Sequence, residues 1–295
     1  MPVFPNQKPG ASFWSLLFMP RTRRKYFSRT FFFCATGILL HATDILAGES
    51  SSESQAEEGR FFALPVELDA DSGASNGDAT ILRIAPLYGL GSLFNGKIIH
   101  LDLLTIADAP GGVPGRPGNP NPEPGDRVFG ISDLVHASFF TPETSGKFVW
   151  GAGGILSIPI ATDGRLGSGK WSAGPSFRFT YRSGPWNFGA FGGQTWSFAG
   201  DDERNDVSQL IMRGAVRRQL PNNWYFVSAP IITANWKAVG QKWLVPLGGG
   251  FGKIFELHSD PWALSLQGYY NVIKPDGAPN WAVRLSMIAA IPLGH

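Results

Sequence analysis

The chain contains few of the residues that build disulfide frameworks and metal centres. Its 295 residues include one cysteine and five histidines, and only 16% of them are charged. A single cysteine excludes a disulfide scaffold and a cysteine-cluster metal site. The low charge content, together with 22 phenylalanines and 10 tryptophans, excludes a disordered acidic or basic tail protein. The length suits one large domain or two modest ones.

Long hydrophobic runs are also missing. After residue 47 no window approaches 18 consecutive apolar residues, which excludes a transmembrane helix from that part of the sequence. Before it, five basic residues within 21–29 precede a ten-residue apolar run over 31–40 and a small residue at Ala47. This order predicts an export signal over 1–47, cleaved after Ala47. Because Cys34 is the sole cysteine, the mature chain would then have none.

Charge is unevenly distributed between the two parts of the sequence. Residues 1–47 carry six basic side chains and one acidic one, whereas the remainder carries 19 basic and 22 acidic residues, a net charge of −3. This remainder gives no support to a nucleic-acid partner. Residues 48–60 are polar and acidic, and we expect a disordered lead-in there.

From residue 61 onward the sequence alternates between apolar and polar residues. Over 171–182 the odd positions are mainly aromatic or apolar, while the even positions hold serine, threonine, glycine and arginine. The stretches 208–217, 262–272 and 281–291 repeat the pattern. Period-2 alternation predicts strands with one apolar and one polar face. Runs of ten to twelve residues match the roughly 9–11 that a tilted strand needs to cross a bilayer.

Tryptophans recur at the predicted strand starts, between turn-forming segments such as 183–185 and 275–277. Trp224, Trp243, Trp262 and Trp281 are 19 residues apart, and Trp186 lies 38 residues before Trp224. One strand and one connection take about that many residues in a membrane barrel. These five tryptophans are predicted to lie alternately at the two membrane interfaces, where an indole ring is half apolar and half hydrated.

The pattern predicts an all-β fold, an antiparallel transmembrane β-barrel of 12 strands over 61–295. Bacterial barrels use even strand numbers, which favours 12. The segment 110–126 holds 11 glycines or prolines in 17 residues and is predicted to be a long loop. A secreted soluble β-sandwich with buried tryptophans is the alternative fold. The predicted strands start near Phe61, Ile81, Lys97, Val128, Phe148, Trp171, Trp186, Val207, Trp224, Trp243, Trp262 and Trp281.

Five arginines fall on the polar face, which in a membrane barrel is the lumen. An arginine at mid-depth on the lipid face costs about 2–4 kcal/mol, so the lumen face is the lower-energy position for these side chains. We interpret them as a basic track that attracts anions, with Tyr269 as a stacking surface for a planar solute. Alternatively, they fill a small barrel by pairing with carboxylates such as Asp163 or Glu256. The five are Arg178, Arg182, Arg213, Arg217 and Arg284.

Several stretches of 147–285 resemble a family of bacterial outer-membrane barrels catalogued under the meta-cleavage pathway of phenol degradation, some of whose members are mislabelled neuromedin U. The matching segments are 167–176 (GSGKWSAGPS), 196–201 (WSFAGD), 224–236, 243–253 and 269–281. The resemblance implies an outer-membrane barrel that transports hydrophobic or aromatic compounds. It supplies no catalytic residues.

No motif in the sequence predicts an enzyme, a metal site or a cofactor. The histidines lack ligand spacing and are expected to be solvated or at strand ends, and no Gly-x-Ser-x-Gly elbow is present. The glycine-rich 248–253 lacks the glycine and hydroxyl spacing of a phosphate loop, so we assign it to a strand. The acidic cluster 201–206 lacks a calcium-loop pattern and is interpreted as a solvated loop.

The sequence therefore predicts an outer-membrane β-barrel channel or transporter for small solutes, with aromatic or anionic solutes as candidates. Its expected partners are outer-membrane lipid, a small solute and the barrel-insertion machinery, and its expected location is the bacterial outer membrane. Two alternatives remain open: a structural or surface-interaction barrel with a plugged lumen, and the secreted sandwich binding a ligand.

Overall fold

The computed structural model describes residues 60–143, 146–258 and 260–291. The predicted export signal (1–47) and residues 48–59 of the lead-in lie outside them. Within the described residues the fold is all-β apart from one short 3-10 helix. No helix in this part of the chain is long and apolar enough to cross a membrane.

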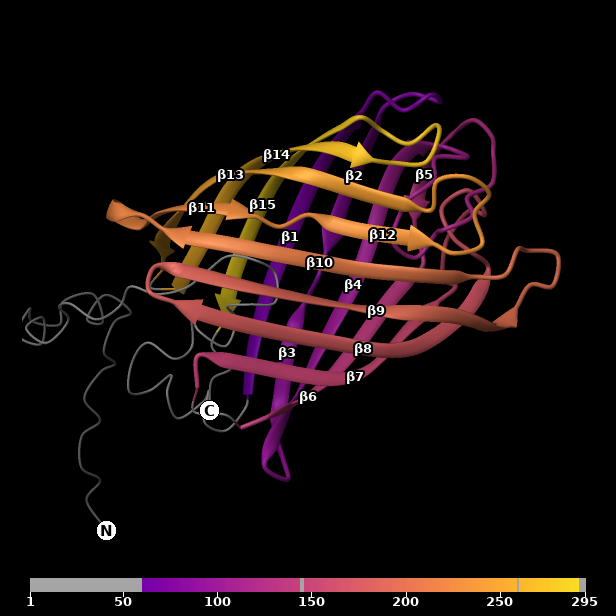
Figure 1. Cartoon of the computed structure of the whole chain (residues 1–295). Helices are drawn as coiled ribbons and strands as arrows, with labels where there is room; N and C mark the ends of the chain where they lie inside the picture. The colour runs from indigo at the N-terminus through magenta and orange to yellow at the C-terminus, as the bar shows by residue number, and fades with distance from the viewer. Residues whose placement is uncertain (1–59, 144–145, 259, 292–295) are drawn as a thin grey trace, which may run out of the picture. The chain divides into compact units, whose positions relative to one another are not determined.

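Fifteen strands in the described residues form one antiparallel sheet (Figure 1). They are β1 (Arg60–Ser72), β2 (Ala79–Ile84), β3 (Leu87–Leu93), β4 (Gly96–Pro110), β5 (Arg127–Ile131), β6 (Leu134–Pro142), β7 (Phe148–Ile158), β8 (Lys170–Ser183), β9 (Trp186–Gly200), β10 (Ser208–Gln219), β11 (Trp224–Ser228), β12 (Ile231–Asn235), β13 (Trp243–Leu257), β14 (Asp260–Ile273) and β15 (Trp281–Ile291), with the 3-10 helix η3 (Pro221–Asn223) before β11.

The sheet closes on itself into a 12-stranded barrel. Both β2 and β3 pair with β1 and β4, so they form one interrupted strand of the wall. Both β11 and β12 likewise pair with β10 and β13. Both β5 and β6 pair with β4, and β6 continues the wall to β7. Two of these breaks contain a proline, Pro86 and Pro230, which cannot donate to the ladder. The pairing of β1 with β15 completes the ring.

The predicted strand count of 12 is confirmed, and each predicted strand starts within two residues of an observed one. The assignment of the glycine-rich 248–253 to a strand also agrees with the structure. A Cβ on Gly248 or Gly250 would overlap a carbonyl oxygen of β14, that of Gly268 or Leu266. Glycine is therefore needed where β13 approaches its neighbour closely.

Side chains alternate between an exposed apolar face and a buried face. Leu266 and Leu285 are 59% and 44% exposed, whereas their neighbours Gln267 and Arg284 are 3% and 4% exposed. On β8, Phe179 is exposed and Arg178 is buried. A closed barrel that turns phenylalanine and leucine outward and arginine inward is built for lipid outside and polar groups inside.

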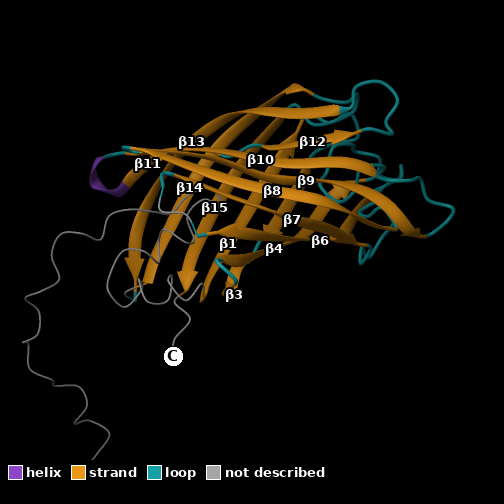
Figure 2. Cartoon of the chain, turned by 60° about the horizontal axis from the view of Figure 1, so that its bottom comes forward, coloured by secondary structure: helices purple, strands orange, loops and turns teal. Residues whose placement is uncertain are grey.

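The two ends of the barrel differ in the length of their connections (Figure 2). Residues 73–78, 111–126, 159–169, 201–207, 236–242 and 274–280 connect strands at one end, and residues 94–95, 184–185 and 220–223 do so at the other. Both β1 and β15 have their outer termini at the short-turn end. In outer-membrane barrels the short turns are periplasmic and the long loops extracellular. We name the two ends accordingly.

Candidate functional site

Buried arginines dominate the interior of the barrel. Among the described residues six arginines and three acidic residues are buried. Of the acids, Glu67 and Asp69 face the lumen from β1, while Asp133 is held near the extracellular end by the backbone N–H and hydroxyl of Ser168. Basic groups therefore outnumber acidic ones in the lumen. The buried arginines are Arg83, Arg116, Arg178, Arg213, Arg217 and Arg284.

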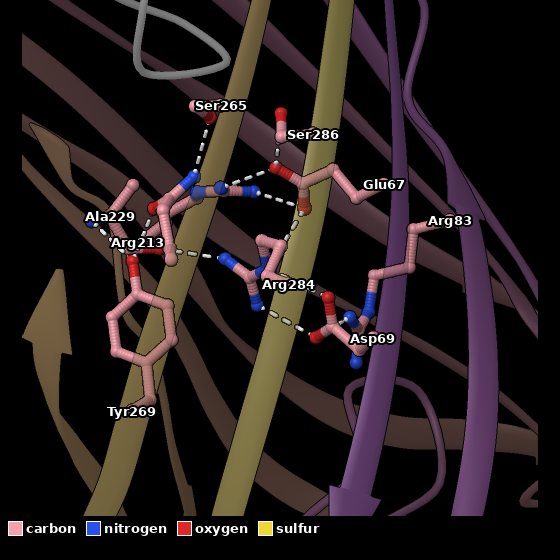
Figure 3. A network of polar contacts seen from close by, with 10 residues as sticks. Glu67, Asp69, Arg83, Arg213, Ala229, Ser265, Tyr269, Arg284 and Ser286 are labelled. Atoms are coloured by element: carbon pink, nitrogen blue, oxygen red, sulfur yellow. Dashed lines mark hydrogen bonds and ion pairs between the residues drawn. The ribbon is translucent and has the colours of Figure 1, made fainter. Parts of the chain in front are cut away.

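A network of ion pairs crosses the lumen at mid-height (Figure 3). Arg213 on β10 donates two hydrogen bonds to Glu67 on β1, at 2.7 and 3.0 Å. Four wall strands separate β10 from β1 on the shorter way round, so this contact spans the barrel. Arg284 on β15 donates two bonds to Asp69, at 2.8 and 2.9 Å, and Arg83 on β2 contacts the same carboxylate.

Tyr269 belongs to this network. Its hydroxyl accepts a hydrogen bond from the Ala229 N–H at 2.8 Å and donates one to Gln267. The Arg284 guanidinium lies 5.3 Å from its ring centroid. The ring face that the sequence analysis offered to a planar solute is therefore occupied by Arg284 in this conformation.

The glycine- and proline-rich loop 111–126 folds into the extracellular half of the lumen. Thr233 on β12 donates to the carbonyl of Gly115 at 3.0 Å, and Asn235 donates to that of Pro120 at 3.0 Å. On β10, Gln209 donates to the carbonyl of Arg116 and accepts from the Gly118 N–H. Side chains of the wall thus satisfy the backbone of a loop that cannot join the sheet.

Arg116, on this inward loop, has no hydrogen-bonded carboxylate among the described residues, although Asp71 interacts with it electrostatically. It is 7% exposed, and neither of its terminal nitrogens has a hydrogen-bond partner among the described residues. The guanidinium lines a cavity of ≈ 60 Å³ together with Asp71, Arg83, Tyr269 and Arg284. Burial lowers the pKa of Arg116 to about 10, which leaves the group charged at neutral pH.

A wider cavity lies above the loop. Its volume is ≈ 340 Å³, and polar residues such as Gln209, Asn235 and Lys242 line it. An apolar cluster also reaches across the lumen and includes Phe61 on β1 and Ile211 on β10. The lumen of the described residues therefore contains a vestibule, an arginine-rich network and an apolar cluster.

The five arginines predicted to form a lumen track occupy different environments. Arg213 and Arg284 are in the ion-pair network, while Arg178 donates to the hydroxyl of Thr141 at 3.3 Å. No carboxylate of the described residues forms an ion pair with Arg178. Arg217 donates to Gln219 and lies 4.6 Å from the ring centroid of Tyr225. Arg182 is exposed near the periplasmic end.

The five predicted interface tryptophans lie at both ends of the barrel. Trp186, Trp224 and Trp262 start their strands at or near the periplasmic end, and Trp243 and Trp281 start theirs at the extracellular end. Trp224 and Trp281 are 46% and 56% exposed. Along 224–281 the tryptophans therefore alternate between the two ends.

The carboxylates that neutralise the track are not the ones that the sequence suggested. Asp163 pairs with its neighbour Arg165, which lowers the pKa of Asp163 to about 2, and Glu256 is exposed. The partners are Glu67 and Asp69. The sequence does carry a signal for them, because Glu67 and Asp69 alternate with Leu68 and Ala70 after the predicted strand start at Phe61. Arg116 was missed because loop 110–126 was not expected to enter the lumen.

The histidine prediction is corrected for two residues. His100 and His136 lie inside β4 and β6, not at strand ends, and their rings stack with centroids 5.6 Å apart. No group of three or more histidine, cysteine or acidic side chains able to hold a metal ion exists among the described residues.

A comparison with a solved structure agrees with this fold. The barrel is similar to an outer membrane channel from Pseudomonas putida F1, with a TM-score of 0.54 and 12% identity over 79% of this chain and 96% of that one. The NanC porin gives a TM-score of 0.47 and 12% identity, over 76% of this chain and 98% of the porin. No family model matches the chain, and no curated protein matches it. Membership of the phenol-degradation barrel family therefore stays a prediction.

These observations place the chain among bacterial outer-membrane β-barrels. The closed 12-stranded wall, the exposed apolar face and the polar lumen are the features of that class. The alternative of a soluble sandwich is wrong, because the sheet closes through β1 and β15.

Proposed function

We propose that the barrel is an outer-membrane channel for small anionic solutes, narrowed by the inward loop 111–126. The observation that carries the proposal is the excess of buried arginine over buried carboxylate in the lumen. A basic lining inside a low-dielectric wall raises the local concentration of anions. Guanidinium groups also stay charged and bind carboxylates through two parallel hydrogen bonds.

Two arginines are the candidate solute contacts. Arg116 presents unpartnered terminal nitrogens to the cavity below the loop, and Arg178 faces the lumen lower down without an ion-pair partner among the described residues. Arg213 and Arg284 are already neutralised by Glu67 and Asp69. An anion would pass from Arg116 through the paired middle to Arg178. The resemblance to the phenol-degradation barrels favours an aromatic solute, and the lumen arginines favour an anion. An aromatic carboxylate has both properties.

The test is ion selectivity in a planar bilayer under a salt gradient. The double variant Arg116→Gln/Arg178→Gln removes two lumen charges without leaving a buried carboxylate unpaired. We expect anion selectivity in the wild type and a reversal potential closer to zero in the double variant. Arg127→Gln, at the exposed extracellular end of β5, is the control and should behave as the wild type.

Cation selectivity in the wild type, or an unchanged reversal potential in the double variant, would contradict the proposal. The plugged barrel remains the second candidate, favoured by the cluster that joins Phe61 and Ile211 across the lumen. If the folded wild type and the folded variant lacking 113–120 both fail to conduct ions, the plugged barrel is established.

A further inference from the structure

A cluster of polar side chains lies on the outer surface of the barrel, on the wall formed by β3, β4 and β6. Directly paired positions bring the side chains together: Tyr88 faces His100, His100 faces Ser138, and Asp102 faces His136. The residues between them point inward, since Leu101 and Ala137 belong to a buried cluster that reaches across the lumen. All five polar side chains are therefore on the face that meets lipid.

Ionisable groups are costly on this face. Most outward positions of the described strands are apolar, as are the neighbours Ile98 and Phe140 on β4 and β6. The Asp102 and His136 side chains are 25% and 31% exposed, so neither is sequestered in the lumen. Ionisable residues at membrane depth are rare and usually functional, which makes the cluster a candidate site.

Hydrogen bonds connect the cluster in a definite order. His136 Nδ1 lies 2.7 Å from Asp102 Oδ1, and His136 Nε2 lies 2.9 Å from Ser138 Oγ. An ionised aspartate only accepts, so Nδ1 carries the proton and Nε2 is free to accept from the serine hydroxyl. His100 Nδ1 lies 2.9 Å from the same Oγ, and the Tyr88 hydroxyl donates to Asp102 Oδ2 at 3.1 Å.

We propose that Ser138, His136 and Asp102 form an ester-hydrolase site that acts on membrane lipids. The arrangement has a nucleophile, a base within hydrogen-bond reach of it, and a carboxylate that fixes the base's tautomer. Ser138 and His136 are the catalytic residues. Asp102 is a positioning residue, and Tyr88 in turn holds its second oxygen.

The reaction is hydrolysis through an acyl-enzyme. Ser138 Oγ attacks the ester carbonyl carbon while its proton moves to His136 Nε2. His100 Nδ1 lies 2.9 Å from the same Oγ, so in the tautomer that protonates Nδ1 it would donate to the tetrahedral oxyanion. The bond to the alcohol oxygen then breaks, and that oxygen takes the proton from His136. Water attacks the acyl-serine, gives its proton to His136, and the fatty acid leaves as the proton returns to Ser138.

The surroundings of Ser138 suit a lipid ester. On β7 its paired neighbour is Gly154, whose missing side chain leaves space beside the nucleophile. Exposed Phe140 and Phe177 supply apolar surface nearby. Ser138 is four residues from Pro142, the periplasmic end of β6. That is about 13 Å along the strand, or roughly 9 Å of depth at a 45° tilt. Ser138 therefore lies in the periplasmic half of the wall.

The test uses the full-length protein refolded into vesicles of phosphatidylethanolamine and phosphatidylglycerol. We expect wild-type protein to release free fatty acid and to form a covalent adduct at Ser138 with a long-chain p-nitrophenyl alkylphosphonate. Ser138→Ala should lose the adduct and lower release by about 100-fold or more. Asp102→Asn should slow both reactions, and Asp102→Glu should restore part of each rate.

Two further variants separate catalysis from folding. Ser157→Ala changes a buried, inward serine on β7 and should leave both reactions unchanged. Gly154→Trp fills the space beside Ser138 and should reduce lipid hydrolysis more than phosphonate labelling. Heat-modifiable migration on gels reports folding of every variant. Fatty-acid release that survives in folded Ser138→Ala, or folded wild type with no release and no adduct, would overturn the proposal.

Discussion

At the residue scale, the lumen is defined by how each arginine is neutralised. Arg213 and Arg284 have carboxylates at hydrogen-bond distance, whereas Arg116 and Arg178 do not. Arg213 joins opposite walls through Glu67, whereas Arg284 pairs with Asp69 on the neighbouring strand. In the proposed function, Arg116 and Arg178 supply charge to a solute. Sequence parity can place an arginine in the lumen, but it cannot distinguish these two roles, because the partners come from strands more than 100 residues away.

Removal of one partner of a buried ion pair should be costly here. Glu67→Gln leaves the buried Arg213 without its counter-charge, and we expect the free energy of unfolding to fall by about 3–5 kcal/mol. Urea unfolding in lipid vesicles measures it. Glu67→Gln/Arg213→Gln should recover part of the loss, because both charges are gone. A loss in the double variant equal to the sum of the losses in Glu67→Gln and in Arg213→Gln alone would show that the pair is not coupled.

At the element scale, the inward loop 111–126 occupies the extracellular half of the lumen. Its backbone is held by Gln209, Thr233 and Asn235, which project from β10 and β12 into the lumen. Glycine and proline predicted a loop correctly, since such a segment cannot pair in a sheet. They did not predict its position, because three polar side chains on distant strands hold the loop inside.

Shortening this loop should widen the channel. Replacement of 113–120 by two glycines removes Arg116 and the segment that Thr233 and Gln209 hold, and we expect severalfold higher single-channel conductance. Removal of 238–240, the exposed hairpin tip before β13, is the matched control and should leave the conductance close to that of the wild type. Equal conductance in all three proteins would exclude the loop as the constriction.

At the scale of the whole molecule, the barrel was predictable and its chemistry was not. Outward aromatic residues recur with period 2 and tryptophans mark strand starts, so strand number and facing follow from local patterns. The functional groups depend on register across the wall. Asp102 and His136 are 34 residues apart in sequence and become neighbours only through the pairing of β4 with β6.

The central claim is that the lumen is an anion-selective path narrowed by loop 111–126. The most direct test is the sign of the reversal potential of single channels in a potassium chloride gradient, for the wild type and for the variant lacking 113–120. The account predicts the sign of the chloride equilibrium potential in both, because Arg178 and the paired network remain when Arg116 is removed. A reversal potential with the sign of potassium in either protein would contradict it.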